Sequence, residues 1–475
     1  MQEPEPNTNL SRLPKPMRPL LLGSIGSQAI TVVLLLLSVP RYGLEIYGSV
    51  AGYFLVKNLL SHFAILKSCN TILRTDCDVR LRQVVASAIL SASFLAVTAV
   101  VATSLLACMQ YLVPLSVWIW LGPSIFAGGL YDLYTAIQLR KDRLVYIGRA
   151  RWIHAFATGG PLLVFSFLAP KAESIVASYF LGYSAAALYL FHWQHSRQAI
   201  AFIRSVGPRA FAPNFNDAIN GVGGSVTETL SYYGIPAVIE AFLGSITAGT
   251  YLIATRIVYM PVILISQASA QTLQGWASRT NKDQVAEYVS RTIGTWAVLI
   301  FGIILILHPV ISILITAVYG QRFSASVLIV SQMLLQTPII WVQRNLEALA
   351  IAQHATGTVW SIRATALIAG VTAIIAQRNA SDVVSVALQA IAASGFVLSI
   401  GTVILCRILL KNTQTSIEWV WASPVCVAIL SLFTAFRYIE SGTVTTIIWI
   451  TSGTFVLALV LVKKLYGRTA SDARS

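Results

Sequence analysis

The stretch LLLGSIGSQAITVVLLLLSV, from Leu20 to Val39, contains no charged residue and is apolar over most of its length. An α-helix needs about 20 predominantly apolar residues to cross the roughly 30 Å hydrocarbon core of a bilayer. A membrane-spanning β-strand would instead alternate apolar and polar residues over about ten positions. Because the run from Val32 to Leu37 is continuously apolar, the stretch predicts a transmembrane helix.

Comparable runs recur along the 475 residues, of which 56% are hydrophobic and only 11% charged. Soluble proteins contain about 25% charged residues, so this composition excludes an ordinary soluble protein. We predict an all-α polytopic membrane protein with about 14 transmembrane helices and no soluble catalytic domain. The predicted spans are Leu20–Val39, Ile46–Leu66, Val84–Leu106, Leu112–Ile137, Trp152–Leu168, Ile175–Phe191, Ile219–Leu243, Ala248–Leu273, Ile293–Ala317, Val327–Ala350, Val359–Ala376, Val383–Leu405, Trp419–Phe436 and Val444–Val462.

The distribution of Lys and Arg predicts the orientation of these spans. With the N-terminus inside, the inner connectors carry 24 Lys and Arg and the outer connectors carry 5. Cytoplasmic loops of membrane proteins are enriched in these residues, so both termini are expected to be cytoplasmic. The same rule accounts for most of the net charge of +15, and no nucleic-acid partner is expected. The polar, Pro-rich residues 1–19 are expected to form a disordered cytoplasmic tail.

A short sequence echo suggests that the chain repeats. The motif G-x-x-G-S begins at Gly23 in the first span and at Gly221 in the seventh span. Two six-helix halves would then point the same way across the membrane. We therefore expect an N-terminal bundle at 20–210, a C-terminal bundle at 211–411, two extra helices at 412–464 and a cytoplasmic tail at 465–475.

Two cations support this division, because each lies inside a predicted span at a matching place. Lys57 follows Gly23 by 34 positions, and Arg256 follows Gly221 by 35. Ionisable residues deep in a span are costly and usually face a cavity or a partner. The pair is therefore predicted to hold an anionic head group in a central cavity. Snorkelling of the side chains to an interface, or structural ion pairing, remains the alternative.

Acidic residues in the spans are candidates for binding a coupling proton or sodium ion. They are Asp132, Glu228 and Glu240, which could equally pair with the cations. Asp132 and Glu240 lie close to span ends, where they could simply be solvated, whereas Glu228 lies deeper. Arg344 and Arg363 lie within or near the predicted tenth and eleventh spans, which makes these two spans the weakest predictions.

Signatures of catalysis are nearly absent from the sequence. There is no G-x-x-x-x-G-K-[ST] nucleotide-binding loop. Asp76-Cys77-Asp78 has the D-x-D pattern of metal-dependent glycosyltransferases, but it lies in a short connector with no nucleotide-binding domain around it. The five cysteines are scattered without metal-ligand spacing. We expect a protein that is not an enzyme and binds neither a cofactor nor a metal.

Four stretches resemble the O-antigen-type polysaccharide flippases of the multidrug/oligosaccharidyl-lipid/polysaccharide exporter superfamily. The strongest runs from Ser231 to Arg279 and is similar to that family's seventh and eighth helices. The segment from Leu130 to Ala155 is similar to the basic loop after its fourth helix. The matching positions in these and the other two stretches include Gly249, Tyr251, Ala254, Arg256, Pro261, Arg41, Tyr42, Gly43, Gly48, Val318, Tyr319, Gly320 and Phe323.

The resemblance implies a MATE-like fold of two six-helix bundles forming a V, plus two extra helices. It implies that the protein moves an undecaprenyl-pyrophosphate-linked oligosaccharide, an O-antigen or exopolysaccharide repeat unit, across a bacterial inner membrane by alternating access. Related lipid II flippases carry cavity cations on the helices that correspond to those of Lys57 and Arg256. Membrane lipid, a glycan polymerase and a chain-length regulator are the implied partners.

One departure and two alternatives qualify this expectation. Where relatives often have an acidic residue in helix seven, this chain has Tyr232, Tyr233 and Gly234. A multidrug or small-cation antiporter of the same superfamily is the second hypothesis, although it would favour an acidic cavity. An integral-membrane glycan polymerase or ligase is the third, and the short outer connectors count against it.

Overall fold

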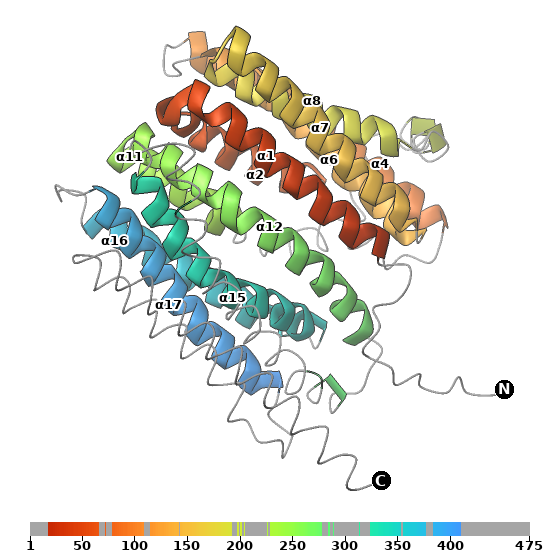
Figure 1. Ribbon diagram of the computed structural model, residues 1–475. Coiled ribbons are helices and arrows are strands. Elements are labelled where there is room, and N and C mark those ends of the chain that lie inside the picture. The colour runs from red at the N-terminus through yellow and green to blue at the C-terminus, as the bar shows by residue number, and fades with distance from the viewer. Residues whose placement is uncertain are drawn as a thin grey trace, which may run out of the picture. The chain divides into compact units, whose positions relative to one another are not determined.

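The structure is a computed structural model that describes residues 18–65, 78–108, 115–141, 143–191, 229–277, 324–352, 355–376 and 383–409, with a few isolated positions between them. Every regular element within these ranges is helical (Figure 1). The fold class expected from the sequence, an all-α membrane protein, is thereby confirmed for this part of the chain.

The chain folds into two compact units that exchange a short segment. Unit 1 comprises residues 1–38 and 57–222, and unit 2 comprises residues 39–56 and 223–475. The chain thus leaves unit 1 within its first helix and returns within its second. The bundle boundaries expected from the sequence, 20–210 and 211–411, stay predictions.

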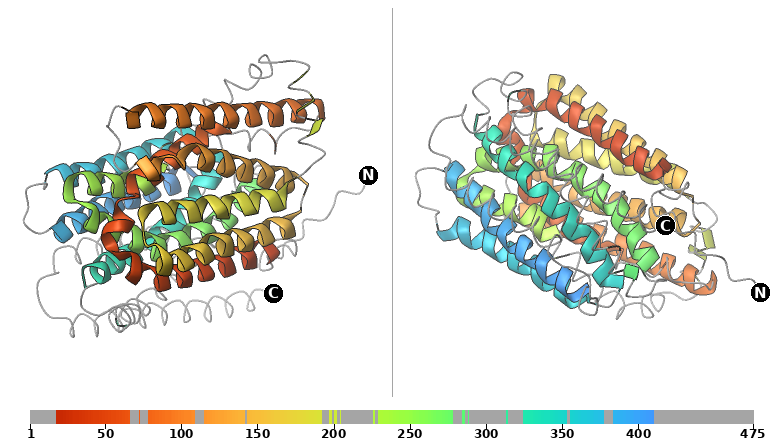
Figure 2. Two further views of the ribbon diagram at one scale, coloured as in Figure 1. Left: turned by 90° about the horizontal axis from the view of Figure 1, so that it is seen from above. Right: turned by 60° about the horizontal axis from the view of Figure 1, so that its bottom comes forward.

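Unit 1 contains long helices that pack along one another. The helices α7 and α8 lie side by side, α6 packs on α8, and α4 packs on α6 (Figure 2). Ile137 and Leu133 of α6 and Val84 of α4 are almost fully buried between them. The elements are α1 (Arg18–Gly48, as far as Ser38), α2 (Ala51–Ala64, from Lys57), α4 (Asp78–Cys108), α5 (Leu115–Trp118), α6 (Leu121–Arg140), α7 (Leu144–Leu168) and α8 (Ala172–Leu190).

Unit 2 is built around α15, which packs against both α12 and α17. Its core is formed by buried aliphatic side chains such as Ile239, Ile329 and Ile391. Besides the end of α1 and the start of α2, the elements are η3 (Leu230–Gly234, a π-helix), α11 (Ile235–Leu243), α12 (Ser245–Ala277), α15 (Ser324–Ala352), α16 (Thr356–Ala376) and α17 (Val383–Leu409).

Glycine allows two helices of unit 2 to approach at backbone distance. A Cβ atom at Gly48 of α1 would clash with the carbonyl oxygen of Ser245, and one at Gly249 of α12 would clash with the carbonyl oxygen of Leu44. Small residues at helix crossings are a common way of packing helices in membranes. Gly43 adds a break, because its φ of 78° is accessible mainly to glycine and interrupts α1.

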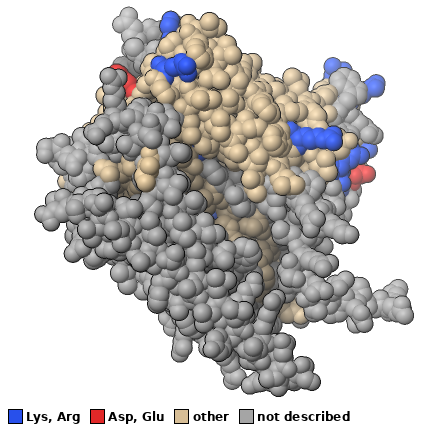
Figure 3. Space-filling model, in the orientation of Figure 1, with Lys and Arg blue, Asp and Glu red and all other residues tan. Residues whose placement is uncertain are grey.

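Much of the outer surface of the described helices is apolar. Leu168 is 76% exposed, and Phe94 and Leu188 are also well exposed. In Figure 3 the described surface in view is mostly uncharged, with Lys and Arg in only a few places. Leu22–Gly48, Asp78–Leu105, Gly357–Ala376 and Val386–Cys406 are long and apolar enough to cross a membrane. This surface is that of a multi-pass membrane protein, whose exposed leucines and phenylalanines contact lipid.

Helices occupy the first eight predicted spans at least in part, and the tenth to the twelfth. The fourth predicted span is divided into α5 and α6, and the first helix continues through Pro40 to Gly48. The ninth, thirteenth and fourteenth spans and both predicted tails lie outside the described residues, apart from isolated positions. The count of fourteen helices therefore stays a prediction.

Candidate functional site

Lys57 of α2 is only 4% exposed. Its Nζ atom lies 3.8 Å from the centroid of the Tyr183 ring, which is the geometry of a cation–π interaction. The ammonium also donates a hydrogen bond to Oδ1 of Asn58 at 3.3 Å. A Cβ atom at Gly128 of α6 would lie 3.4 Å from Nζ. The absence of a side chain at this position therefore leaves room for the Lys57 ammonium beside α6. Unit 1 thus holds a cation among three of its apolar helices, α2, α6 and α8.

The ring beneath Lys57 belongs to an aromatic cluster. His154 of α7 lies edge-on to Tyr183, with 4.6 Å between ring centroids, and stacks on Tyr131 of α6 at 5.9 Å. The side chains come from three helices, so packing of α6, α7 and α8 fixes the orientation of the Tyr183 ring. Sequence reasoning missed this cluster, because its members lie far apart along the chain and no local motif joins them.

Arg256 of α12 has a similar environment in unit 2. Its guanidinium carbon lies 5.4 Å from the ring centroid of Phe54 and 5.9 Å from that of Tyr233. Phe54 stands three residues before Lys57 on α2. Each of the two cations predicted from the sequence therefore lies against aromatic rings, within reach of cation–π attraction.

The acidic candidates have different surroundings. The Glu240 carboxylate, at the end of α11, accepts a hydrogen bond of 2.9 Å from the backbone N–H of Gly52. Because Gly52 lies in the first turn of α2, this carboxylate satisfies an amide that the helix itself leaves without an acceptor. Asp132 lies half-buried on α6, and Glu228 lies outside the described residues. Roles for these acids in ion coupling stay predictions.

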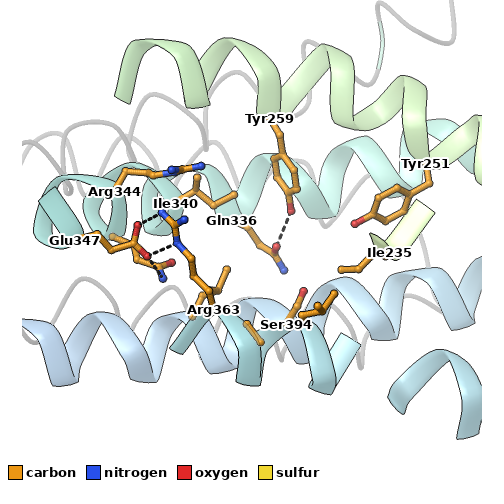
Figure 4. A pocket seen from close by; sticks show the side chains of 13 residues that line it. Ile235, Tyr251, Tyr259, Gln336, Ile340, Arg344, Glu347, Arg363 and Ser394 are labelled. Atoms are coloured by element: carbon orange, nitrogen blue, oxygen red, sulfur yellow. Dashed lines mark hydrogen bonds and ion pairs between the residues drawn. The ribbon is translucent and has the colours of Figure 1, made fainter. Parts of the chain in front are cut away.

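A pocket lined by both polar and apolar side chains lies inside unit 2, on the side of α15 that faces α12, α16 and α17 (Figure 4). Its volume is about 60 Å³. The residues that line it are Ile235, Tyr251, Tyr259, Gln336, Ile340, Gln343, Arg344, Glu347, Arg363, Ala366, Leu367, Ser394 and Leu398.

A buried ion pair forms part of the pocket wall. The Glu347 side chain, 3% exposed, accepts hydrogen bonds from Nε of Arg363 at 2.9 Å and also from its Nη2. Nε2 of Gln343 donates a third bond to the same carboxylate at 3.0 Å. The pair explains how an arginine is accommodated in the eleventh predicted span. The sequence analysis identified Arg363 as unusual but did not consider Glu347. A carboxylate inside the tenth predicted span was the feature that could have indicated an ion pair.

The described residues contain no group of three or more His, Cys, Asp or Glu side chains that could hold a metal ion.

No protein-family model and no curated protein sequence matches the chain. Solved structures do match its fold. The lipid II flippase MurJ in an inward closed conformation aligns with a TM-score of 0.62 at 12% identity, over 95% of this chain and 99% of that one. An inward-facing MATE multidrug resistance transporter of the MOP superfamily aligns with a TM-score of 0.56 at 11% identity, over 82% and 96% of the two chains. A variant of the Vibrio cholerae MATE transporter VcmN aligns with a TM-score of 0.54 at 10% identity, over 84% and 95%.

The chain has the fold of MurJ and MATE transporters. These proteins are the structural relatives expected of the superfamily that the sequence resembles, so the expectation of a MOP-type fold is confirmed. The narrower expectation of an O-antigen-type polysaccharide flippase is a proposal, because sequence identities of 10–12% show a shared fold and nothing about the substrate.

Proposed function

We propose that this protein is a flippase that moves an undecaprenyl-pyrophosphate-linked oligosaccharide across the bacterial inner membrane by alternating access. The observation that carries the proposal is the environment of Lys57, an ammonium that is 4% exposed within an apolar helical unit. A buried charge in a membrane helix is costly, so its retention favours a functional partner. The MOP-type fold supports the proposal, since one protein that shares it is a lipid II flippase.

The chemistry of the two cations suits a pyrophosphate. Stacking on an aromatic face leaves the in-plane N–H groups of a guanidinium directed outward, where they can bind phosphate oxygens as a pair. Arg256 is half-buried, and its guanidinium carbon lies over the rings of Phe54 and Tyr233 at 5.4 and 5.9 Å from their centroids, which supports such an arrangement. Lys57 supplies a compact point charge over the Tyr183 ring, and the contact with His154 holds that ring in place. In a medium of low dielectric constant such charges attract an anion more strongly than they do in water.

The proposed coupling acids are Asp132 and Glu228. The carboxylate of Glu240 already accepts the Gly52 amide, so we assign it chiefly to holding the start of α2. A multidrug or cation antiporter shares this fold and is the second candidate. The cationic character of Lys57 and Arg256 favours an anionic substrate over it.

The test is binding of undecaprenyl pyrophosphate to the purified full-length protein in nanodiscs, followed by native mass spectrometry or thermophoresis. Lys57→Ala and Arg256→Ala should each weaken binding about tenfold or more, since a hydrogen bond to a charged group contributes about 1.5–3 kcal/mol. Uncharged undecaprenol should bind all variants alike. Lys171→Ala, which removes an exposed cation before α8, is the matched control and should bind normally.

The same variants should be tested in cells for surface glycan, with membrane insertion measured in parallel. Lys57→Arg should retain part of the activity because it keeps the charge. Unchanged pyrophosphate binding and normal glycan in the double variant Lys57→Ala/Arg256→Ala would overturn the proposal. Ion-dependent export of a cationic dye by the wild type, without lipid pyrophosphate binding, would favour the antiporter.

A further inference from the structure

Tyr251 of α12 places a buried hydroxyl group in the pocket of unit 2. The residue is only 4% exposed, and its hydroxyl points into the pocket (Figure 4). Tyr259, further along the same helix, donates its hydroxyl to Oε1 of Gln336 at 2.7 Å. The Tyr251 hydroxyl, by contrast, makes no hydrogen bond within the described part of the chain. The pocket therefore contains a polar group that the described residues leave without a partner.

A buried hydroxyl of this kind is costly, which makes it informative. A buried donor without an acceptor loses the hydrogen bonds that it makes to water, whereas an apolar group of the same shape carries no such penalty. Phenylalanine would fill the same space as Tyr251 without this cost. The hydroxyl is therefore best explained by a group that enters the pocket and binds it.

The polar wall near Tyr251 suits hydroxyl groups. Nε2 of Gln336 donates to the carbonyl oxygen of Ile391 at 2.6 Å, and with the bond from Tyr259 this holds the amide in one orientation. Ser394 donates its hydroxyl hydrogen to the same carbonyl at 3.0 Å, so the Ser394 oxygen is left to accept a bond from a ligand. Amides and hydroxyls both donate and accept hydrogen bonds, as the hydroxyl groups of a sugar do.

The opposite character of the remaining wall favours a sugar over water alone. The lining includes the aliphatic side chains of Ile235, Ile340, Leu367 and Leu398. Ligand pockets typically combine an apolar lining with a few fixed polar groups. A sugar presents C–H groups beside its hydroxyls and can contact both kinds of wall, whereas water finds no partner on the aliphatic side.

The size of the pocket limits what it can hold. A water molecule needs about 10–15 Å³ of such space, so a volume of about 60 Å³ holds roughly four to six waters. This is room for one edge of a sugar ring, such as a hydroxymethyl group with a neighbouring hydroxyl. It is too small for a whole oligosaccharide.

We propose that this pocket is a subsite for a neutral sugar of the transported glycan, with the Tyr251 hydroxyl bound to a sugar hydroxyl. The Gln336 amide and the Ser394 oxygen bind the neighbouring hydroxyl, and the aliphatic wall contacts the C–H groups of the ring. This inference rests on the proposed function in that the transported lipid would deliver the sugar. It deepens that function by making Tyr251 a specificity-determining residue for the glycan, apart from the cations assigned to the pyrophosphate.

The test uses the full-length protein in nanodiscs and three soluble sugars, glucose, galactose and N-acetylglucosamine. Binding is measured by titration with saturation-transfer-difference NMR. At least one sugar should bind the wild type, and Tyr251→Phe should weaken it about fivefold, the effect of one hydrogen bond between neutral groups. Tyr146→Phe removes a hydroxyl from a tyrosine of α7 that is 46% exposed, and this matched control should bind like the wild type. If no sugar binds, so that the pocket holds water only, or if binding survives Tyr251→Phe unchanged, the inference is overturned.

Thermal unfolding distinguishes a ligand-binding hydroxyl from a structural one. Without sugar, Tyr251→Phe should leave the unfolding temperature unchanged or raise it, because no bond to a described residue is lost. Tyr259→Phe removes the bond to Gln336 and should lower it. An equal lowering in both variants would show that the protein itself uses the Tyr251 hydroxyl, and the inference would be wrong.

Failure of this inference can be distinguished from failure of the proposed function. Tyr251→Phe should leave the binding of undecaprenyl pyrophosphate, which carries no sugar, unchanged. If Lys57→Ala and Arg256→Ala leave that binding intact while Tyr251→Phe weakens sugar binding, the head-group proposal fails and the subsite stands. If lipid binding needs both cations but no sugar depends on Tyr251, the flippase proposal stands and the sugar subsite is wrong.

Discussion

Replacing Glu347 by glutamine should destabilise unit 2 substantially. The substitution keeps the size of the side chain and removes its charge, which leaves the Arg363 guanidinium, 12% exposed, without its carboxylate. Breaking a buried ion pair by removing one partner costs about 3–5 kcal/mol. Because glutamine can still accept a hydrogen bond and Arg363 keeps some exposure, we expect a loss of free energy of unfolding near the lower limit, about 3 kcal/mol.

The measurement is a double-mutant cycle on the purified protein, with equilibrium unfolding in mixed micelles. The variants are Glu347→Gln, Arg363→Gln and the double substitution. The double variant strands no charge, so it should lose less stability than the two single variants together, with a coupling energy of about 1–3 kcal/mol. Glu45→Gln, at an exposed position of α1, is the matched control and should change stability little. Additive effects, each below about 1 kcal/mol, would refute the argument that the pair is buried and mutually compensating.

Three more predictions concern packing and charge. Lys57→Met should lower the free energy of unfolding by no more than about 1–2 kcal/mol, the contribution of a cation–π contact, while surface glycan is lost; a much larger loss of stability would make the lysine structural. Gly48→Ala should cost about 1–3 kcal/mol through its clash with the backbone of α12, whereas Gly160→Ala, where a Cβ meets no neighbouring atom within 4 Å, should not destabilise; equal thermal shifts would contradict the close approach. The Ser116 hydroxyl donates a hydrogen bond that lowers the pKa of the half-buried Glu173 carboxyl from its ordinary value of 4.5. A lowered folded-state pKa stabilises the protein above the ordinary value, and this stability disappears as the pH falls through the folded value. Ser116→Ala should therefore reduce the decline in thermal stability below pH 4.5, and an unchanged pH profile would exclude this interaction.

The sequence predicted the helices well because membrane burial imposes a simple requirement. Each span must be apolar over about 20 residues, and this is visible along the chain without knowledge of packing. The break of α1 at Gly43 was harder to predict from the sequence. Pro40 lies just before it, but whether a helix bends, ends or continues past a proline depends on its neighbours. The structure continues α1 to Gly48 and joins that end to α12 by a backbone approach that only glycine permits.

The candidate site was predictable only in part. Lys57 and Arg256 stand out because charge inside an apolar run is rare, and the structure places both against aromatic rings. The rings themselves were not predictable, since Tyr183 and Phe54 resemble the many aromatic residues of membrane helices. Arg344 and Arg363 were noticed as irregularities in their spans.

The sequence alone determined that the chain forms apolar helices that cross a membrane, that its loops favour one orientation, and that two cations lie within its spans. These properties follow from the hydrophobic effect and from charge, which act on each segment separately. Only the tertiary structure decided that Glu347 is the partner of Arg363 and that Arg344 lines the same pocket as this pair. It alone also decided that the Lys57 ammonium lies over the Tyr183 ring. Such contacts join residues from different helices, and their strength depends on distances of a few ångströms that no linear pattern encodes.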